Sequence, residues 1–235
     1  MSLVAGADGC RAGWLCVWKD TETDKIGHQI FSTAHDLMHQ NPRLSVIAID
    51  IPIGLTGAGR RDCDCQARKL LGQPRGTSVF PAPIRPALAA KSREEANRIT
   101  SAADGRGVGV QSWGIFPKVK EVDTELIEQP GLQGFAHEVH PELSFWAWNG
   151  RKPMSMAKKK SEGKAQRRRL IDAYFGNEIF QSIRSGNFKK DVADDDINDA
   201  LAALWTAERI LEGKAQRIPE MPPSDSCGLR MEMWY

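Results

Sequence analysis

The sequence lacks any uninterrupted apolar stretch of about 18 residues, which is the length that a membrane-spanning helix requires. Its first residues also lack the basic segment of a secretory signal, and Asp8 soon interrupts the apolar run that follows Met1. Cysteine is sparse, and five residues are an odd number, so we expect reduced thiols rather than a disulfide framework. The sequence therefore predicts a soluble, cytoplasmic protein.

Patterns of several other site classes are missing as well. Cys63 and Cys65 have no second pair of Cys or His at zinc-site spacing, and the glycine-rich segment 105–109 has no Walker lysine. A chain of 235 residues, with 41% hydrophobic and 26% charged residues, can bury a core without a structural metal or disulfides. We therefore expect a single domain over residues 1–235.

Hydrophobic periodicity predicts alternating strands and helices. Strands are expected at residues 3–8, 14–18, 26–31, 44–51 and 134–140. Helices are expected at 33–40, 61–71, 92–103, 118–128, 164–175, 178–184 and 195–211, with 143–148 either helix or strand and the chain after 219 irregular. Short turns make the first three strands an antiparallel meander, and the β-branched run 44–51 is typical of a central parallel strand. We thus predict an α/β fold, with a five-stranded mixed sheet flanked by helices and a helical insertion at about 56–130 between strands four and five.

Two aspartates lie in or at the end of predicted buried strands. Asp8 ends the first strand and Asp50 lies at the end of the fourth, where a carboxylate is costly to bury unless a cation or metal pairs with it. In open α/β sheets, ligands bind beyond the carboxyl ends of the parallel strands. The alternative is a turn, because Asp8 precedes Gly9 and Asp-Gly is a common turn pair. For either aspartate alone, the turn is the better interpretation.

The last predicted helix adds two more carboxylates. Asp196 and Asp199 are three residues apart and therefore neighbours on one flank, which continues into the small residues Ala200, Ala203 and Ala207. Small residues allow the helix to approach the sheet closely and hold its carboxylates near the strand ends. Complementarity with the helix dipole explains acids in the first turn but explains Asp199 less well.

Four carboxylates from three segments, Asp8, Asp50, Asp196 and Asp199, predict a site for Mg²⁺ or Mn²⁺, which prefer oxygen ligands. Two such ions about 4 Å apart can activate a water and stabilise the leaving oxygen in phosphodiester cleavage. Glu138 and Glu142 are both candidates for a further ligand or for positioning water. Glu142 could instead be a first-turn residue of a short helix.

The element order resembles the ribonuclease H-like fold, and several motifs resemble the DUF429 family of predicted ribonuclease H-like nucleases. These motifs are Asp8-Gly9-Cys10-Arg11-Ala12-Gly13-Trp14, Ile49-Asp50-Ile51-Pro52-Ile53-Gly54-Leu55, Arg61-Asp62-Cys63-Asp64, Ser78-Val79-Phe80-Pro81-Ala82-Pro83, Glu138-Val139-His140-Pro141-Glu142 and Asp199-Ala200-Leu201. The resemblance covers nearly the whole chain. It implies a metal-dependent nuclease whose catalytic residues are Asp8, Asp50, Glu142, Asp196 and Asp199.

Basic residues suggest where nucleic acid would bind. Residues 151–169 contain nine Lys or Arg and one Glu, a block that could steer a polyanion or form an ordinary solvated face. Arg61 and Arg85, in the insertion, could grip phosphates through bidentate contacts or be ordinary surface residues. The candidate substrate-binding residues are Arg11, Arg61, Arg85 and Lys160.

Three functions are compatible with this sequence. The first is a metal-dependent nuclease. The second is a non-catalytic binding or regulatory protein that retains the fold. The third is a phosphotransferase of the actin-like ATPase kind, which shares the strand order and an early Asp-Gly turn but normally needs two copies of a core that 235 residues supply once.

Overall fold

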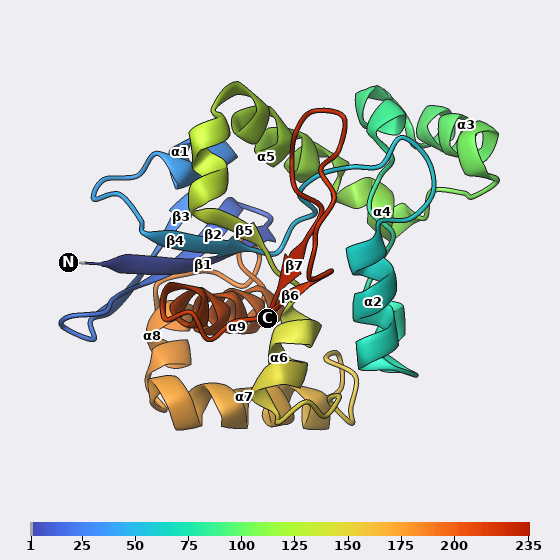
Figure 1. Cartoon of the computed structure of the whole chain (residues 1–235). Helices are drawn as coiled ribbons and strands as arrows, with labels where there is room; N and C mark the ends of the chain where they lie inside the picture. Colours follow the sequence, from blue (N-terminus) through green and yellow to red (C-terminus); the bar gives the residue numbers. More distant parts are fainter. Residues whose placement is uncertain (1) are drawn as a thin grey trace.

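A computed structural model of the chain describes residues 2–235 and contains a five-stranded sheet in the order β3-β2-β1-β4-β5 (Figure 1). The strands are β1 Leu3–Cys10, β2 Gly13–Asp20, β3 Ile26–Phe31, β4 Val46–Ile49 and β5 Ala136–Glu138. The first three strands are antiparallel, whereas β4 is parallel to both β1 and β5. The predicted α/β class and mixed sheet are confirmed, and the arrangement is consistent with a ribonuclease H-like fold.

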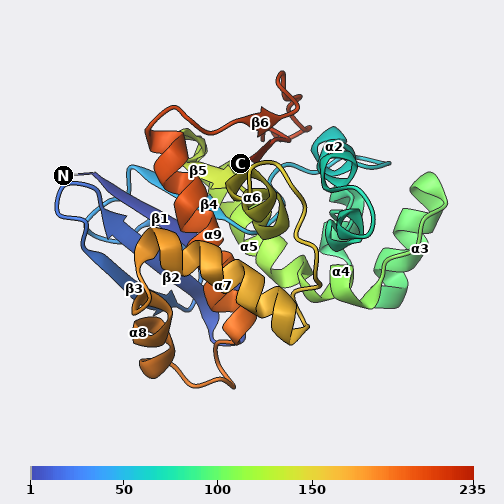
Figure 2. The ribbon, with the colours of Figure 1, turned by 90° about the horizontal axis from the view of Figure 1, so that it is seen from below.

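Helices cover both faces of the sheet. The helices are α1 Ala34–Met38 and α5 Phe116–Glu128 on one face, and α7 Ser161–Phe175, α8 Ile179–Ser185 and α9 Asp194–Leu211 on the other (Figure 1). Figure 2, seen from below, shows α9 against the sheet and α7 crossing outside it. Successive residues of β1 alternate between the two apolar cores, since Val4 packs with α9 and Ala5 packs with α5.

The closest approach between helix and sheet occurs at Gly6 of β1. A Cβ atom on Gly6 would lie 2.0 Å from the backbone nitrogen of Leu204 and 2.2 Å from the carbonyl oxygen of Ala200. Ala200, Ala203 and Ala207 are fully buried in the same interface. The small residues therefore allow α9 to lie directly on β1, as the sequence predicted.

The insertion between β4 and β5 contains helices that Figure 1 places beyond the end of the sheet toward which β1 and β4 point. Its elements are α2 Asp62–Leu71, η1 Arg75–Ser78, η2 Arg85–Ala89, α3 Arg93–Asp104, α4 Val110–Gly114, α5 and η3 Pro130–Gly134. The short helix α4 was not predicted, because five residues give too little periodicity to detect. The insertion therefore forms one wall next to the strand ends.

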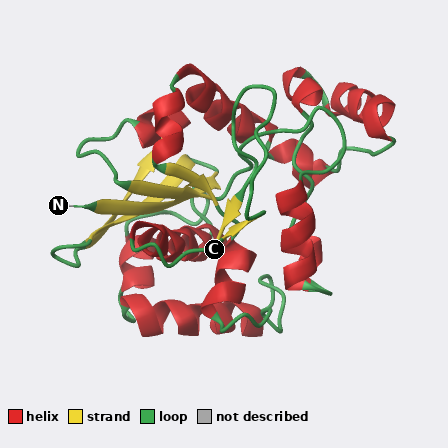
Figure 3. Cartoon of the chain, in the orientation of Figure 1, coloured by secondary structure: helices red, strands yellow, loops and turns green. Residues whose placement is uncertain are grey.

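The structure decides one open alternative of the sequence analysis and corrects two predictions (Figure 3). The segment that could have been helix or strand is helix α6 Pro141–Trp148, and β5 is three residues long rather than seven because Pro141 begins that helix. The C-terminal segment is not wholly irregular, since β6 Arg217–Ile218 pairs with β7 Met233–Trp234. Among residues 2–235, every helix is too short or too polar to cross a bilayer.

Candidate functional site

Three carboxylates meet at the carboxyl ends of β1 and β4. Asp8 lies in β1, Asp50 directly follows β4, and Asp199 lies in the second turn of α9. Each offers an oxygen, and the three oxygens lie within 4.8 Å of one another. Asp8 is 9% exposed and Asp199 is 4% exposed. The structure thus brings together three of the four aspartates that the sequence singled out.

Sheet register and helix contact explain why these side chains converge. Ala7 pairs with Ile49, and the backbone N–H of Asp50 donates to the carbonyl oxygen of Ala7 at 3.0 Å, so the two strands end side by side. Asp8 follows Gly6 on the face of β1 that contacts α9, because side chains alternate along a strand. The close contact at Gly6 brings the first turns of α9 to the same edge.

Asp196 has a different role at the start of α9. Its Oδ2 atom accepts a hydrogen bond from the backbone N–H of Ala193 at 2.8 Å, which satisfies one of the free donors at the helix start. Asp196 lies outside the group of three carboxylates, although its charge contributes to the raised pKa of Asp8. Helix capping therefore accounts for Asp196, whereas Asp199 lies beyond the first turn and faces the other aspartates.

Two of the three carboxylates, Asp8 and Asp50, are difficult to ionise. Burial raises the pKa of Asp50 from 3.8 to about 7, and the charge of Asp199 adds to this effect. Burial, followed by the charge of Asp50, raises the pKa of Asp8 well above its usual value. Because a cation would favour the charged forms, the site has the electrostatic character of a cation-binding centre.

Lys158 supplies a cation at the edge of the cluster. Its Nζ atom donates to Oδ2 of Asp199 at 2.8 Å, and Asp199 is the main cause of a raised pKa for this lysine. Lys158 belongs to the basic block, but its pairing with Asp199 was not predicted, since the two residues are 41 positions apart.

The structure separates the two candidate glutamates. Glu142, in the first turn of α6, binds the buried Arg167, whose Nη2 donates to Oε1 at 2.5 Å and to Oε2 at 2.7 Å. Glu142 lines the same cleft as Asp8 and Asp50. Glu138 instead accepts from Arg61, at 2.6 Å from Nη1 and 2.7 Å from Nη2, and from the backbone of Ile53. Glu142 is therefore the glutamate that faces the aspartate cluster.

Two of the predicted substrate-binding arginines are engaged inside the protein. Arg61 is 2% exposed and pairs with Asp64 and Glu138, while Arg85 pairs with Asp123 at 2.8 Å and also with Asp225. Bidentate contacts were expected for these arginines, but the carboxylates that they grip belong to the protein. The guanidinium groups of Arg61 and Arg85 are therefore engaged in internal ion pairs and do not form part of a substrate surface. Arg11 and Lys160 are exposed.

A cavity of about 350 Å³ opens over the carboxylates. Its lining includes Asp8, Asp50, Phe80, Lys118, His140, Glu142 and Lys158. Lys118 and the exposed Phe80 come from the insertion and were not predicted as site residues, although Phe80 lies in one of the sequence motifs. Burial lowers the pKa of His140, so its ring is neutral near pH 7. The site therefore combines acidic, basic and apolar groups around one opening.

Comparisons with known proteins extend this description. No curated protein and no solved structure matches the chain. One family model matches residues 6–224, nearly the whole chain, and its description is a protein of unknown function. The match extends from β1 beyond the end of α9, and therefore includes all three clustered aspartates. The chain belongs to the DUF429 family.

Proposed function

We propose that this protein is a nuclease that hydrolyses phosphodiester bonds in nucleic acid with Mg²⁺ or Mn²⁺. The observation that carries the proposal is the convergence of Asp8, Asp50 and Asp199, whose oxygens lie within 4.8 Å of one another at the carboxyl ends of parallel strands. An all-oxygen donor set favours hard divalent cations over zinc or copper. The raised pKa values of Asp8 and Asp50 also support a site completed by positive charge.

Each residue of the site has a role in this proposal. Asp8, Asp50 and Asp199 would hold the ions, whose chemistry there would be to activate water and to stabilise the leaving oxygen. Glu142 is held in place by Arg167 and positions a water or adds a ligand from the cleft wall. Asp196 fixes the start of α9 and adds negative charge.

Exposed basic residues beside the cleft would hold the nucleic acid backbone. Lys159 lines the cleft, and Lys160 and Arg11 are exposed. Such contacts are sequence-independent and weaken as salt concentration rises. Arg167 does not belong to this surface, because it is buried and its guanidinium nitrogens all donate inside the protein. Nε and Nη2 donate to Glu142, and Nη1 donates to the carbonyl oxygen of Gly163.

A panel of nucleic acids tests the proposal directly. Single-stranded, duplex and branched DNA and RNA are incubated with the wild type and with Asp8→Asn, in Mg²⁺, in Mn²⁺ and in EDTA. We expect cleavage of at least one substrate by the wild type with metal, and none by Asp8→Asn. Equal activity of the two proteins would refute the proposal. Metal-independent binding without cleavage of any substrate would favour the non-catalytic alternative.

Lys158 should compete with the divalent cation. Its ammonium group lies 2.8 Å from an oxygen of Asp199. Lys158→Met should therefore tighten Mn²⁺ binding at least about tenfold, which corresponds to about 1.4 kcal/mol. Calorimetric titration with Mn²⁺ measures this change. Lys159→Met is the matched control, because Lys159 lines the same cleft but, among the ion pairs described, only Lys158 pairs with Asp199. Unchanged affinity in Lys158→Met would show that the lysine and the metal bind at separate places.

A further inference from the structure

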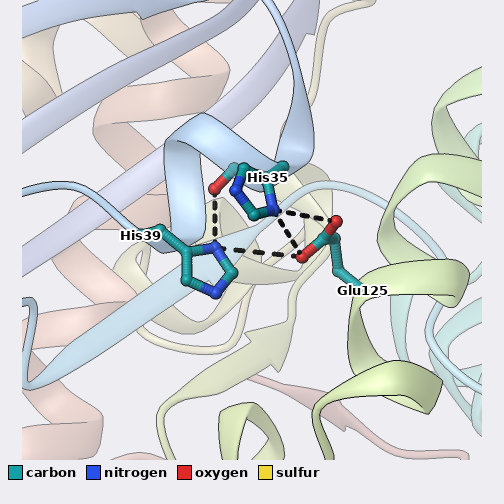
Figure 4. Close-up of side chains that lie close together, drawn as sticks. All are labelled: His35, His39 and Glu125. Carbon is teal, nitrogen blue, oxygen red and sulfur yellow. Dashed lines mark hydrogen bonds and ion pairs between the residues drawn. The ribbon is translucent and has the colours of Figure 1, made fainter.

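A second group of metal-ligating side chains lies between α1 and α5, on the face of the sheet opposite α9 (Figure 4). His35 is in α1, and His39 follows it by four residues at the C-cap, so the two rings share one side of the helix. Glu125 comes from α5 and points toward both rings in Figure 4. The donor atoms of these three residues lie within 4.8 Å of one another.

The spacing of the donor atoms suits a small tetrahedral ion. Nδ1 of His35 lies 3.2 Å from each oxygen of Glu125, and Nδ1 of His39 lies 3.8 Å from Oε2 of the same carboxylate. Zinc bonds of about 2.0–2.1 Å at tetrahedral angles place neighbouring ligand atoms about 3.3 Å apart. A shift of roughly half an ångström would therefore bring the 3.8 Å separation of His39 and Glu125 to this spacing.

Contacts around His39 engage both ring nitrogens and leave Nδ1 on the side of Glu125. Nε2 of His39 lies 3.0 Å from Oε1 of Gln129, an acceptor that holds the ring proton on Nε2. A partner of this kind commonly orients a metal-binding imidazole and fixes its tautomer. Nδ1 of His39 donates to the carbonyl oxygen of His35 at 2.9 Å, so a bound metal would replace both this hydrogen bond and the proton on Nδ1.

The group is accessible from solvent. The side chain of His35 is 58% exposed, so its ring can adjust without disturbing the core. A hollow of about 420 Å³ borders His35 and Glu125. Two of the three ligands border this opening, which leaves room for water as a fourth ligand, the arrangement found at open zinc sites.

We infer that His35, His39 and Glu125 form a binding site for a borderline divalent transition metal, of which Zn²⁺ is the representative, separate from the aspartate cluster. Two imidazoles and one carboxylate favour Zn²⁺ over Mg²⁺, which prefers oxygen alone. The bound ion cross-links α1 to α5. Because α1 has only five residues and cannot be stable alone, this link strengthens its attachment to the domain.

Titration of the metal-free protein of 235 residues with ZnCl₂ tests the inference, with thermal unfolding and calorimetry as readouts. The proteins are the wild type, Glu125→Gln, the double variant His35→Gln/His39→Asn, and Glu128→Gln, which changes an exposed glutamate on the same helix. We expect Zn²⁺ to raise the unfolding temperature of the wild type and of Glu128→Gln. Affinity should fall at least tenfold in Glu125→Gln and further in the double variant.

A second background separates this site from the aspartate cluster. In Asp8→Asn/Asp199→Asn, the wild-type Zn²⁺ affinity at the histidine site should persist, and Co²⁺ should give the absorption spectrum of a tetrahedral site with nitrogen ligands. Loss of Zn²⁺ binding in this background, with full binding in the histidine double variant, would overturn the inference. Because His35 and His39 are both exposed, failure of the variants to fold is not expected to obscure the result.

Discussion

Asp50→Asn should lower metal-dependent cleavage by at least about 100-fold, and at the same time it should stabilise the metal-free protein. Activity should be lost because the amide of Asn carries no charge to hold a cation. Even changes in residues that only support metal ligands commonly lower metal affinity or activity by about 10- to 100-fold. The gain in stability follows because Asp50 lies beside Asp8 and Asp199 in a buried cluster. A residue kept only for folding would show the opposite behaviour.

The pH dependence of stability follows from the pKa of Asp50. Burial raises this pKa from 3.8 to about 7 in the folded protein, with a further contribution from Asp199. Between these values the folded protein retains a proton that the unfolded chain has released, so the free energy of unfolding decreases as pH rises. Asn has no such proton to release, and the variant should therefore be more stable than the wild type at pH 8 by the order of 2 kcal/mol.

Urea denaturation of both proteins at pH 5 and pH 8, in EDTA and in Mn²⁺, measures this effect. Asp24→Asn is the matched control, because the side chain of Asp24 is 83% exposed and its φ of 57° is one that asparagine tolerates. Mn²⁺ should stabilise the wild type and the control but not Asp50→Asn. A destabilised Asp50→Asn in EDTA at pH 8 would indicate that this carboxylate has a structural role.

Arg61→Met should lower the free energy of unfolding by about 3–5 kcal/mol, because it leaves buried carboxylates without their partner. Arg61 is 2% exposed, and its guanidinium binds Asp64 and Glu138, which are also buried. The contact joins the start of α2 to the end of β5, so the variant should also loosen the insertion from the sheet.

Arg60→Met provides the control for this change, since Arg60 is the exposed neighbour in sequence and should alter stability by no more than about 0.5 kcal/mol. Restoring charge balance with Arg61→Met/Glu138→Gln should recover part of the loss. If Arg61→Met lowers the free energy of unfolding by less than about 1 kcal/mol, water or another group replaces the guanidinium as the partner of the buried carboxylates.

Much of the fold could be predicted because its elements have strong local patterns. The β-branched run that ends at Asp50 contains β4, and the polar turn at residues 19–24 is followed by the strand expected at 26–31, which is β3 Ile26–Phe31. The pair β6 and β7 could not be predicted, since each strand has two residues and is fixed by its partner and by the bridge from Trp234 to Val139. Short elements of this kind depend on tertiary contacts rather than on periodicity.

The site was predictable only in part for a related reason. Asp8, Asp50 and Asp199 lie at strand ends and on a helix flank whose places follow from topology. The choice between Glu138 and Glu142 depends on Arg61 and Arg167, which approach them from 77 and 25 residues away. The same long-range pairing places Arg61 inside the protein, although its position among the arginines of the insertion suggested a phosphate contact.

The glycine in the first strand has a consequence for which ions the site would accept. Because nothing but hydrogen separates the strand at Gly6 from the backbone of α9, the spacing between helix and sheet is at its minimum. Asp199 lies one residue before Ala200, whose carbonyl oxygen is among the nearest atoms to a Cβ placed on Gly6. Asp8 lies on the strand two residues after Gly6. The close backbone contact at Gly6 thus sets the separation of the two backbone positions that carry these carboxylates. In the proposed metal site, such a spacing would discriminate among cations by ionic radius, and Gly6, which touches no ligand, would help to set the selectivity.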